Sequence, residues 1–109
     1  MNAPASTIIS THKQYIVATP NIRSGKPRIN GRRITVADIA SWYLELHFSI
    51  EKIAAEHNLT PAQIHAALAY YYDHRSEIDR REAEEQKIVD ALKQQTPSKL
   101  QTKLADLDQ

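Results

Sequence analysis

The sequence predicts a mainly α-helical fold. A small N-terminal strand and β-hairpin precede a helix-turn-helix, homeodomain-like core of three helices, and a long fourth helix and a short C-terminal amphipathic segment follow. Asn30-Gly31 lies between short β-type runs and is typical of a two-residue hairpin turn. Ser49 and Thr60 begin two helix-start patterns separated by a short break, as in a helix-turn-helix. Ser76 and Asp79 mark the start of a fourth helix, and Thr96-Pro97-Ser98 breaks it.

The length of 109 residues allows one domain with tails. We expect a mobile N-terminus over 1–12, a strand, hairpin and helix-turn-helix domain over 13–75, a fourth helix over 76–95, and a tail over 96–109. The absence of cysteine excludes disulfides and zinc-thiolate sites. The sequence also shows no long apolar run and no signal-peptide pattern, which indicates a soluble cytoplasmic protein without a membrane partner.

The hairpin predicted around Asn30-Gly31 concentrates positive charge. A type I′ turn needs a positive φ at both central residues, and it would place Ile29 opposite Arg32 and Arg28 opposite Arg33. Because side chains alternate along a strand, Lys26, Arg28 and Arg33 would then share one face. Opposed like charges are destabilising without a counter-ion. The hairpin therefore either binds an anion or is a solvated basic turn.

The helices follow from caps and apolar spacing. Thr35 with Asp38 predicts the first helix start, and the apolar positions on one side of that helix are Val36, Ile39, Trp42, Tyr43 and Leu46. A second helix runs from Ser49 to about His57, with Asn58 as a left-handed C-cap. The third begins at Thr60-Pro61, and its predicted buried side contains Ile64, Ala67, Leu68 and Tyr71. The fourth has a thin apolar stripe of Ile78, Ile88, Val89 and Leu92.

Three sequence blocks occur in order along the chain: Gly25-Lys26-Pro27-Arg28-Ile29-x-Gly31-x-Arg33-Ile34-x-Val36, then the run 49–54, then the run 59–70. Together they resemble the bacterial family called domain of unknown function 433, over about residues 14–75. The resemblance implies a helix-turn-helix protein, and many members are described as antitoxins encoded beside PIN-like ribonuclease toxins. This chain departs from the family pattern at Arg32, where the family has Thr, and at His47, where a Gly normally ends the first helix.

The third helix is a poor match to a DNA-reading helix. Base readout relies on Arg, Lys, Asn or Gln, and here only Gln63 and His65 are suitable. If DNA is bound, most contacts should be phosphate contacts that position without specifying sequence. The candidate nucleic-acid-binding residues are Arg23, Lys26, Arg28, Arg32, Arg33, Gln63 and His65. The small residues of this helix instead favour close helix approach, so we expect a homodimer with contacts at Ala62, Ala66, Ala69, Ile88 and Leu92.

The sequence does not indicate an enzyme. It contains no cysteine, no serine in a nucleophile-elbow context, and no phosphate-cradling glycine loop. Its five histidines are not paired at i, i+4 on one helix, so no metal site is predicted, and no cofactor is expected.

Charge and the tail suggest two partners. Residues 1–37 hold six basic and no acidic side chains, whereas residues 38–109 hold eight basic and thirteen acidic ones. Leu100, Leu104 and Leu107 form one apolar stripe, which either docks on a partner or packs back on its own domain or dimer mate. The family resemblance implies the leading hypothesis, a non-enzymatic antitoxin that neutralises a PIN-like ribonuclease through this C-terminal part and also binds operator DNA. The charge of Arg80 or Arg81 suggests that one of them replaces the nuclease metal. The alternatives are a dimeric structural or interaction module without a nucleic-acid role and a stand-alone DNA-binding regulator.

Overall fold

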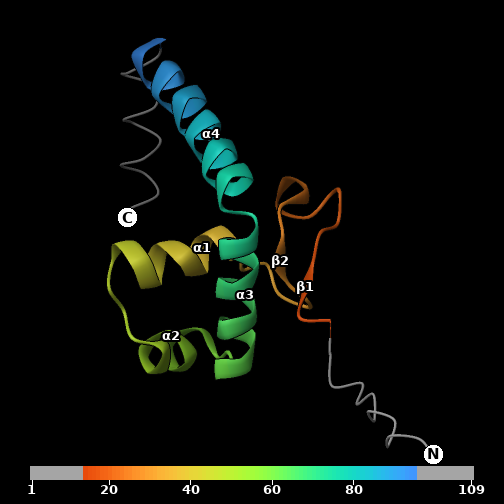
Figure 1. Ribbon diagram of the computed structural model, residues 1–109. Helices are drawn as coiled ribbons and strands as arrows, with labels where there is room; N and C mark the ends of the chain where they lie inside the picture. Colours follow the sequence, from red (N-terminus) through yellow and green to blue (C-terminus); the bar gives the residue numbers. More distant parts are fainter. Residues whose placement is uncertain (1–13, 96–109) are drawn as a thin grey trace, which may run out of the picture. The chain divides into compact units, whose positions relative to one another are not determined.

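The computed structural model describes residues 14–95 and is mainly helical (Figure 1). The chain divides into two units, Met1–Tyr71 and Tyr72–Gln109, and each is described by itself. The predictions for residues 1–12 and 96–109, including the leucine stripe of the tail, lie outside the described residues.

A two-stranded antiparallel sheet begins the first unit. Strand β1 (Ile16–Val17) pairs with β2 (Arg28–Ile29), with Ile16 opposite Ile29 and Val17 opposite Arg28. The strands are joined through a short 3-10 helix, η1 (Arg23–Gly25). The expected strand over 14–17 is therefore present in a shorter form, and β2 is paired with it directly.

The turn after β2 differs from the predicted type I′ hairpin. Gly31 has a φ of 80°, but Asn30 is not among the described residues with positive φ. Ile29 N–H donates to Ile34 O at 2.8 Å, and a β-bridge joins Arg28 to Thr35, so the predicted register is wrong by two residues. The reason lies in β1: Asn30 N–H donates to Tyr15 O at 2.8 Å, which extends the β1–β2 pairing through Asn30.

The first helix starts as predicted and then widens. Helix α1 (Val36–Ala40) begins with a capping box in which Asp38 N–H donates to Thr35 Oγ1 and Thr35 N–H donates to Asp38 Oδ2, both at 3.0 Å. A π-helical segment, η2 (Ser41–Glu45), follows. Leu46 N–H donates to Ser41 O, five residues back, so the residues after Ala40 are rotated relative to an α-helix. Tyr43 and Leu46, predicted for the core side, are consequently 37% and 54% exposed.

The helix-turn-helix region agrees closely with the prediction. Helix α2 (Ile50–His57) is capped by Ser49, whose hydroxyl accepts from Lys52 N–H, and ends at Asn58 with a φ of 52°. Helix α3 (Pro61–Asp73) buries Ile64, Ala67, Leu68 and Tyr71. Figure 1 shows α3 between α2 on one side and the sheet on the other. The most deeply buried core residues come from β2, α1, α2 and α3: Ile29, Val36, Ile39, Ile53, Ile64 and Ala67.

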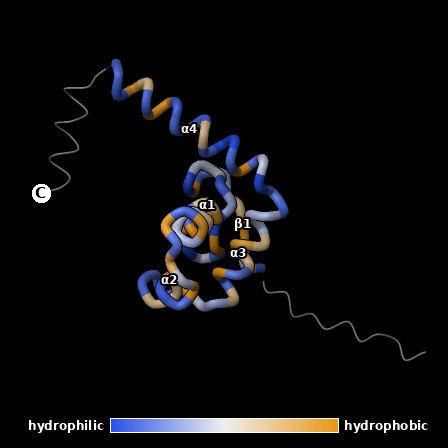
Figure 2. The backbone as a smooth tube through the Cα atoms, turned by 60° about the vertical axis from the view of Figure 1, so that its left-hand side comes forward, coloured by the Kyte–Doolittle hydropathy of each residue, from blue (hydrophilic) through white to orange (hydrophobic). Residues whose placement is uncertain are grey.

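The second unit contains one long helix, α4 (Arg75–Gln95), close to the predicted range. Ile78 is buried, whereas Ile88, Val89 and Leu92 are exposed. Figure 2 shows that α4 is mainly hydrophilic, with short hydrophobic interruptions. None of the helices within residues 14–95 is long and apolar enough to cross a membrane.

Candidate functional site

The candidate site in the first unit is the basic loop, which we define as residues 28–33. Arg28 at its start is only 8% exposed. Its Nη1 donates to Arg32 O at 2.9 Å and its Nη2 donates to Thr19 Oγ1 at 3.0 Å, while its buried Nε has no hydrogen-bond partner. Because the guanidinium is directed into the protein, Arg28 holds the loop in shape.

Arg32 fastens the basic loop to the end of α2. Its Nη2 donates to His57 O at 2.7 Å and its Nη1 donates to Asn58 O at 3.0 Å. These carbonyls belong to the last turn and C-cap of a helix, where backbone acceptors lack helical partners and a positive charge is favourable. The ring of His57 in turn stacks on Trp42, with 3.9 Å between centroids and 3° between planes. Arg32 therefore links the loop to α2 and, through His57, to η2.

Arg23 provides a third connection, from η1. Its Nη1 donates to Arg33 O at 2.7 Å and to Asp38 Oδ2 at 3.1 Å. Asp38 is the same carboxylate that closes the capping box of α1. Arg23 thus ties the far end of the basic loop to the helix start, and both of these hydrogen bonds come from Nη1.

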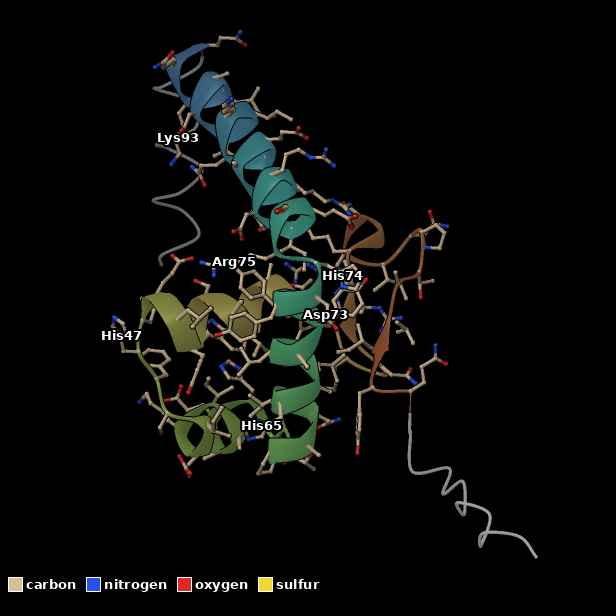
Figure 3. All side chains as sticks on the ribbon, viewed as in Figure 1. His47, His65, Asp73, His74, Arg75 and Lys93 are labelled. Atoms are coloured by element: carbon tan, nitrogen blue, oxygen red, sulfur yellow. The ribbon has the colours of Figure 1, made fainter. Side chains whose placement is uncertain are left out.

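The other candidate nucleic-acid residues are placed differently. Arg33 is exposed, and within residues 14–95 its side chain has no polar partner, whereas Lys26 is half-buried. Gln63 Oε1 accepts from Thr60 N–H at 2.8 Å, so this amide oxygen is used in the α3 capping box. His65 is exposed on α3 (Figure 3).

The tip of the basic loop and the start of α3 face a common hollow. It is open to solvent, has a volume of about 530 Å³, and is lined by Gln14, Tyr15, Asn30, Thr60, Ala62 and Gln63. The structure therefore brings Asn30 of the loop near Gln63 of α3. No sequence pattern indicates this hollow, because it depends on the pairing of β1 with β2.

The candidate partner residues in the described part of the second unit lie on α4. Arg80 is exposed and Arg81 is half-buried, while Ile88 and Leu92 are 61% and 51% exposed. On α3, the proposed dimer residues Ala62 and Ala69 are exposed and Ala66 is half-buried. The dimer contact itself stays a prediction.

Electrostatics and metal-ligand geometry add little to the site. A hydrogen bond from Lys52, whose Nζ lies 2.9 Å from Glu56 Oε1 on α2, lowers the pKa of the Glu56 carboxyl below its ordinary value of 4.5. Among residues 14–95, no group of three or more His, Asp or Glu side chains is arranged to hold a metal ion.

Comparison with known proteins gives one match. Residues 16–71 match the family model described as "Protein of unknown function (DUF433)". This range begins at β1 and ends at Tyr71, the last residue of the first unit, so α4 lies outside it. No curated protein and no solved structure matches the chain.

Proposed function

We propose that this protein, which belongs to the DUF433 family, is a non-enzymatic antitoxin that neutralises a PIN-like ribonuclease through its C-terminal part. The observation that supports this most is the division of the chain. The family module occupies the first unit, and a separate long helix with exposed apolar residues follows it. A structured module joined to an amphipathic extension suits a protein that binds a protein partner through the extension and keeps the structured module for a second role, such as DNA binding.

In this proposal the second unit contacts the nuclease. PIN-like nucleases work through acidic metal sites, so a guanidinium from Arg80 or Arg81 replaces the metal charge, and Leu100, Leu104 and Leu107 supply apolar contacts. The exposure of Arg80 supports its assignment. A bidentate arginine–carboxylate contact is also the geometry that such an acidic site favours.

Operator binding is the second part of the proposal and rests on the first unit. Arg33 and Lys26 would contact phosphates, while Arg28 and Arg32 keep the loop in shape. Contacts of this kind position a protein on DNA without reading bases. Sequence specificity would therefore come from DNA shape and from pairing of two chains.

The decisive experiment is co-expression of the full chain with the product of the neighbouring gene, which this proposal expects to be a PIN-like nuclease, followed by purification and a ribonuclease assay. We expect a stable complex without nuclease activity, and loss of inhibition in the Arg80→Glu, Arg81→Glu double variant. Lys93→Glu, another charge reversal on α4, is the matched control and should still inhibit. A nuclease that remains fully active beside the parent chain would disprove the antitoxin role.

One observation favours a second candidate, an interaction module without a nucleic-acid role. Arg23, Arg28 and Arg32 are committed to hydrogen bonds within the fold, which reduces the charge available to DNA. A parent chain that fails to shift any DNA at low salt would favour this candidate, and a stand-alone regulator would bind DNA without a nuclease partner.

A further inference from the structure

The tip of the basic loop is an exposed turn made by Asn30 and Gly31. Arg32 N–H donates to Ile29 O at 3.0 Å across the turn, and the φ of Gly31 is 80°. This combination is typical of a type II turn, in which the third residue needs a positive φ. A Cβ placed on Gly31 would meet no atom beyond its chain neighbours within 4 Å, so the tip is open to solvent.

The backbone N–H that follows Asn30 is placed differently from those that follow Asn21 and Asn58. The N–H after Asn21 donates to a carbonyl oxygen at 3.0 Å, and the N–H after Asn58 does so at 3.1 Å. Both belong to residues with branched side chains, isoleucine and leucine. The N–H of Gly31 has no hydrogen-bond partner within residues 14–95, and glycine carries no Cβ to shield it. Among the asparagines of this described part, Asn30 alone therefore precedes an unshielded amide nitrogen without a partner.

We propose that Asn30 and Gly31 form a self-modification site, at which the side-chain amide of Asn30 is converted into a carboxylate. The Gly31 nitrogen, once it has given its proton to water, attacks Asn30 Cγ and closes a five-membered succinimide ring. The Cγ–Nδ2 bond breaks, and Nδ2 takes up a proton from water and leaves as ammonia. Water then adds to one of the two ring carbonyls and breaks its bond to the ring nitrogen, which leaves aspartate or isoaspartate at position 30. The sum is one water in and one ammonia out, without an oxidant or a reductant.

The side chain of Asn30 is held by one exposed hydrogen bond, from its Nδ2 to Gln14 O at 3.2 Å. An exposed bond of this kind exchanges with water at little net cost. The backbone N–H of Asn30 donates to Tyr15 O at 2.8 Å, which anchors residue 30 to β1 but leaves the following peptide able to rotate. The attack on Cγ therefore requires rotation of the peptide at the tip, with loss of the turn hydrogen bond from Arg32, and no unfolding of the sheet.

The product changes both the charge and the path of the basic loop. A carboxylate at position 30 adds a negative charge between Arg28 and Arg32 in the sequence, which lowers the attraction of the loop for polyanions. In the isoaspartate product the main chain also runs through the former side chain, so it is one atom longer before Arg32. Arg32 holds the end of α2 through His57 O and Asn58 O, so this lengthening strains the link between the loop and α2. The proposal goes beyond the antitoxin function and does not depend on it, because the reaction needs only the loop and water.

Peptide mapping by mass spectrometry of the full chain, aged in native buffer at fixed pH and temperature, tests the site. We expect Asn30 to convert at least about tenfold faster than Asn21 or Asn58, because their following N–H groups must first lose a hydrogen bond. Asn30→Gln is the matched control and should stay unconverted over the same period, since its longer side chain would have to close a six-membered ring. Equal rates at the three asparagines would overturn the proposal. So would an Asn30 that converts in urea but stays intact in native buffer, because the fold would then protect it.

Charge variants test the consequence for the loop on immobilised heparin, a polyanion that takes the place of DNA. Asn30→Asp reproduces one product, and Gln94→Glu places the same charge at an exposed position of α4, in the second unit. We expect Asn30→Asp to elute at lower salt than Gln94→Glu, with both variants folded by circular dichroism. Equal elution would refute the effect assigned to the carboxylate. Neither readout involves a nuclease, so failure of this site and failure of the antitoxin role are distinguishable.

Discussion

His47 occupies a backbone conformation that glycine adopts more easily, and replacing it tests the strain in this turn. Its φ is 59°, in the left-handed region, and its side chain is exposed, pointing away from the helices of the first unit (Figure 3). An L side chain in this conformation costs about 1–2 kcal/mol, because Cβ approaches the following carbonyl oxygen. Glycine avoids that cost but loses about 0.5–1 kcal/mol more conformational entropy on folding.

We therefore expect His47→Gly to raise the free energy of unfolding by about 0.5–1 kcal/mol. For a domain of this size, such a change raises the melting temperature by about 2–8 °C. Urea and thermal unfolding followed by far-ultraviolet circular dichroism measure both quantities. Because the side chain is exposed, removing it should cost little packing energy.

Two controls isolate the backbone effect. His47→Ala removes the imidazole but keeps Cβ, so it should not stabilise the protein. Asn58→Gly changes a second left-handed residue, with a φ of 52°. It should raise the free energy of unfolding by less than His47→Gly does, because asparagine tolerates this region. A His47→Gly variant no more stable than His47→Ala would refute the strain argument.

Three further predictions test contacts of the first unit. Arg32→Thr removes two hydrogen bonds to the end of α2 and should lower the free energy of unfolding by about 1–2 kcal/mol in urea titrations. Arg28→Gln leaves buried loop carbonyls without donors and should cost about 2–4 kcal/mol, whereas the exposed Arg33→Gln should cost nothing measurable by the same titration. A hydrogen bond from Lys52 lowers the pKa of Glu56, so this pair stabilises the fold above about pH 4.5. The stabilisation is lost as the pH falls through the lowered pKa. The variant Glu56→Gln should therefore lose this dependence of the melting temperature on acid pH.

The helix boundaries were predictable because local chemistry determines them. Thr35, Ser49 and Thr60 each accept a hydrogen bond from a backbone N–H three residues later. These contacts lie within four residues of sequence, so the capping motifs report them directly. The buried side of α3 was likewise predictable, since the spacing of its apolar residues repeats with the helical turn.

The path of the chain after Ala40 was not predictable from spacing. The apolar positions 36, 39, 42, 43 and 46 fit an α-helix, but η2 is π-helical, and Tyr43 and Leu46 are exposed. The stacking of Trp42 on His57 joins residues fifteen positions apart. This stacking holds Trp42 in place within η2, and no local sequence pattern predicts a contact between residues so far apart.

The strand register of the basic loop was predicted wrongly for a related reason. Charge and alternation placed Arg28 and Arg33 opposite each other, but the register depends on β1, which pairs with the other edge of β2. Arg32 reaches carbonyls 25 and 26 residues further along the chain. Counting basic residues cannot separate an arginine that caps a distant helix from one that meets solvent.

The number of basic side chains that are free to contact phosphates, rather than held within the fold, determines the salt dependence of any DNA binding. Each phosphate neutralised contributes about −0.9 to the slope of log K against log salt. If Arg33 and Lys26 are the two phosphate contacts, the slope should be near −2 for each bound chain. If Arg23, Arg28 and Arg32 also turned outward on binding, the slope would approach −5, and their hydrogen bonds to the loop, to α2 and to Asp38 would be lost. A filter-binding titration over a range of salt concentrations measures the slope, and a value near −5 would refute the structural role assigned to these three arginines.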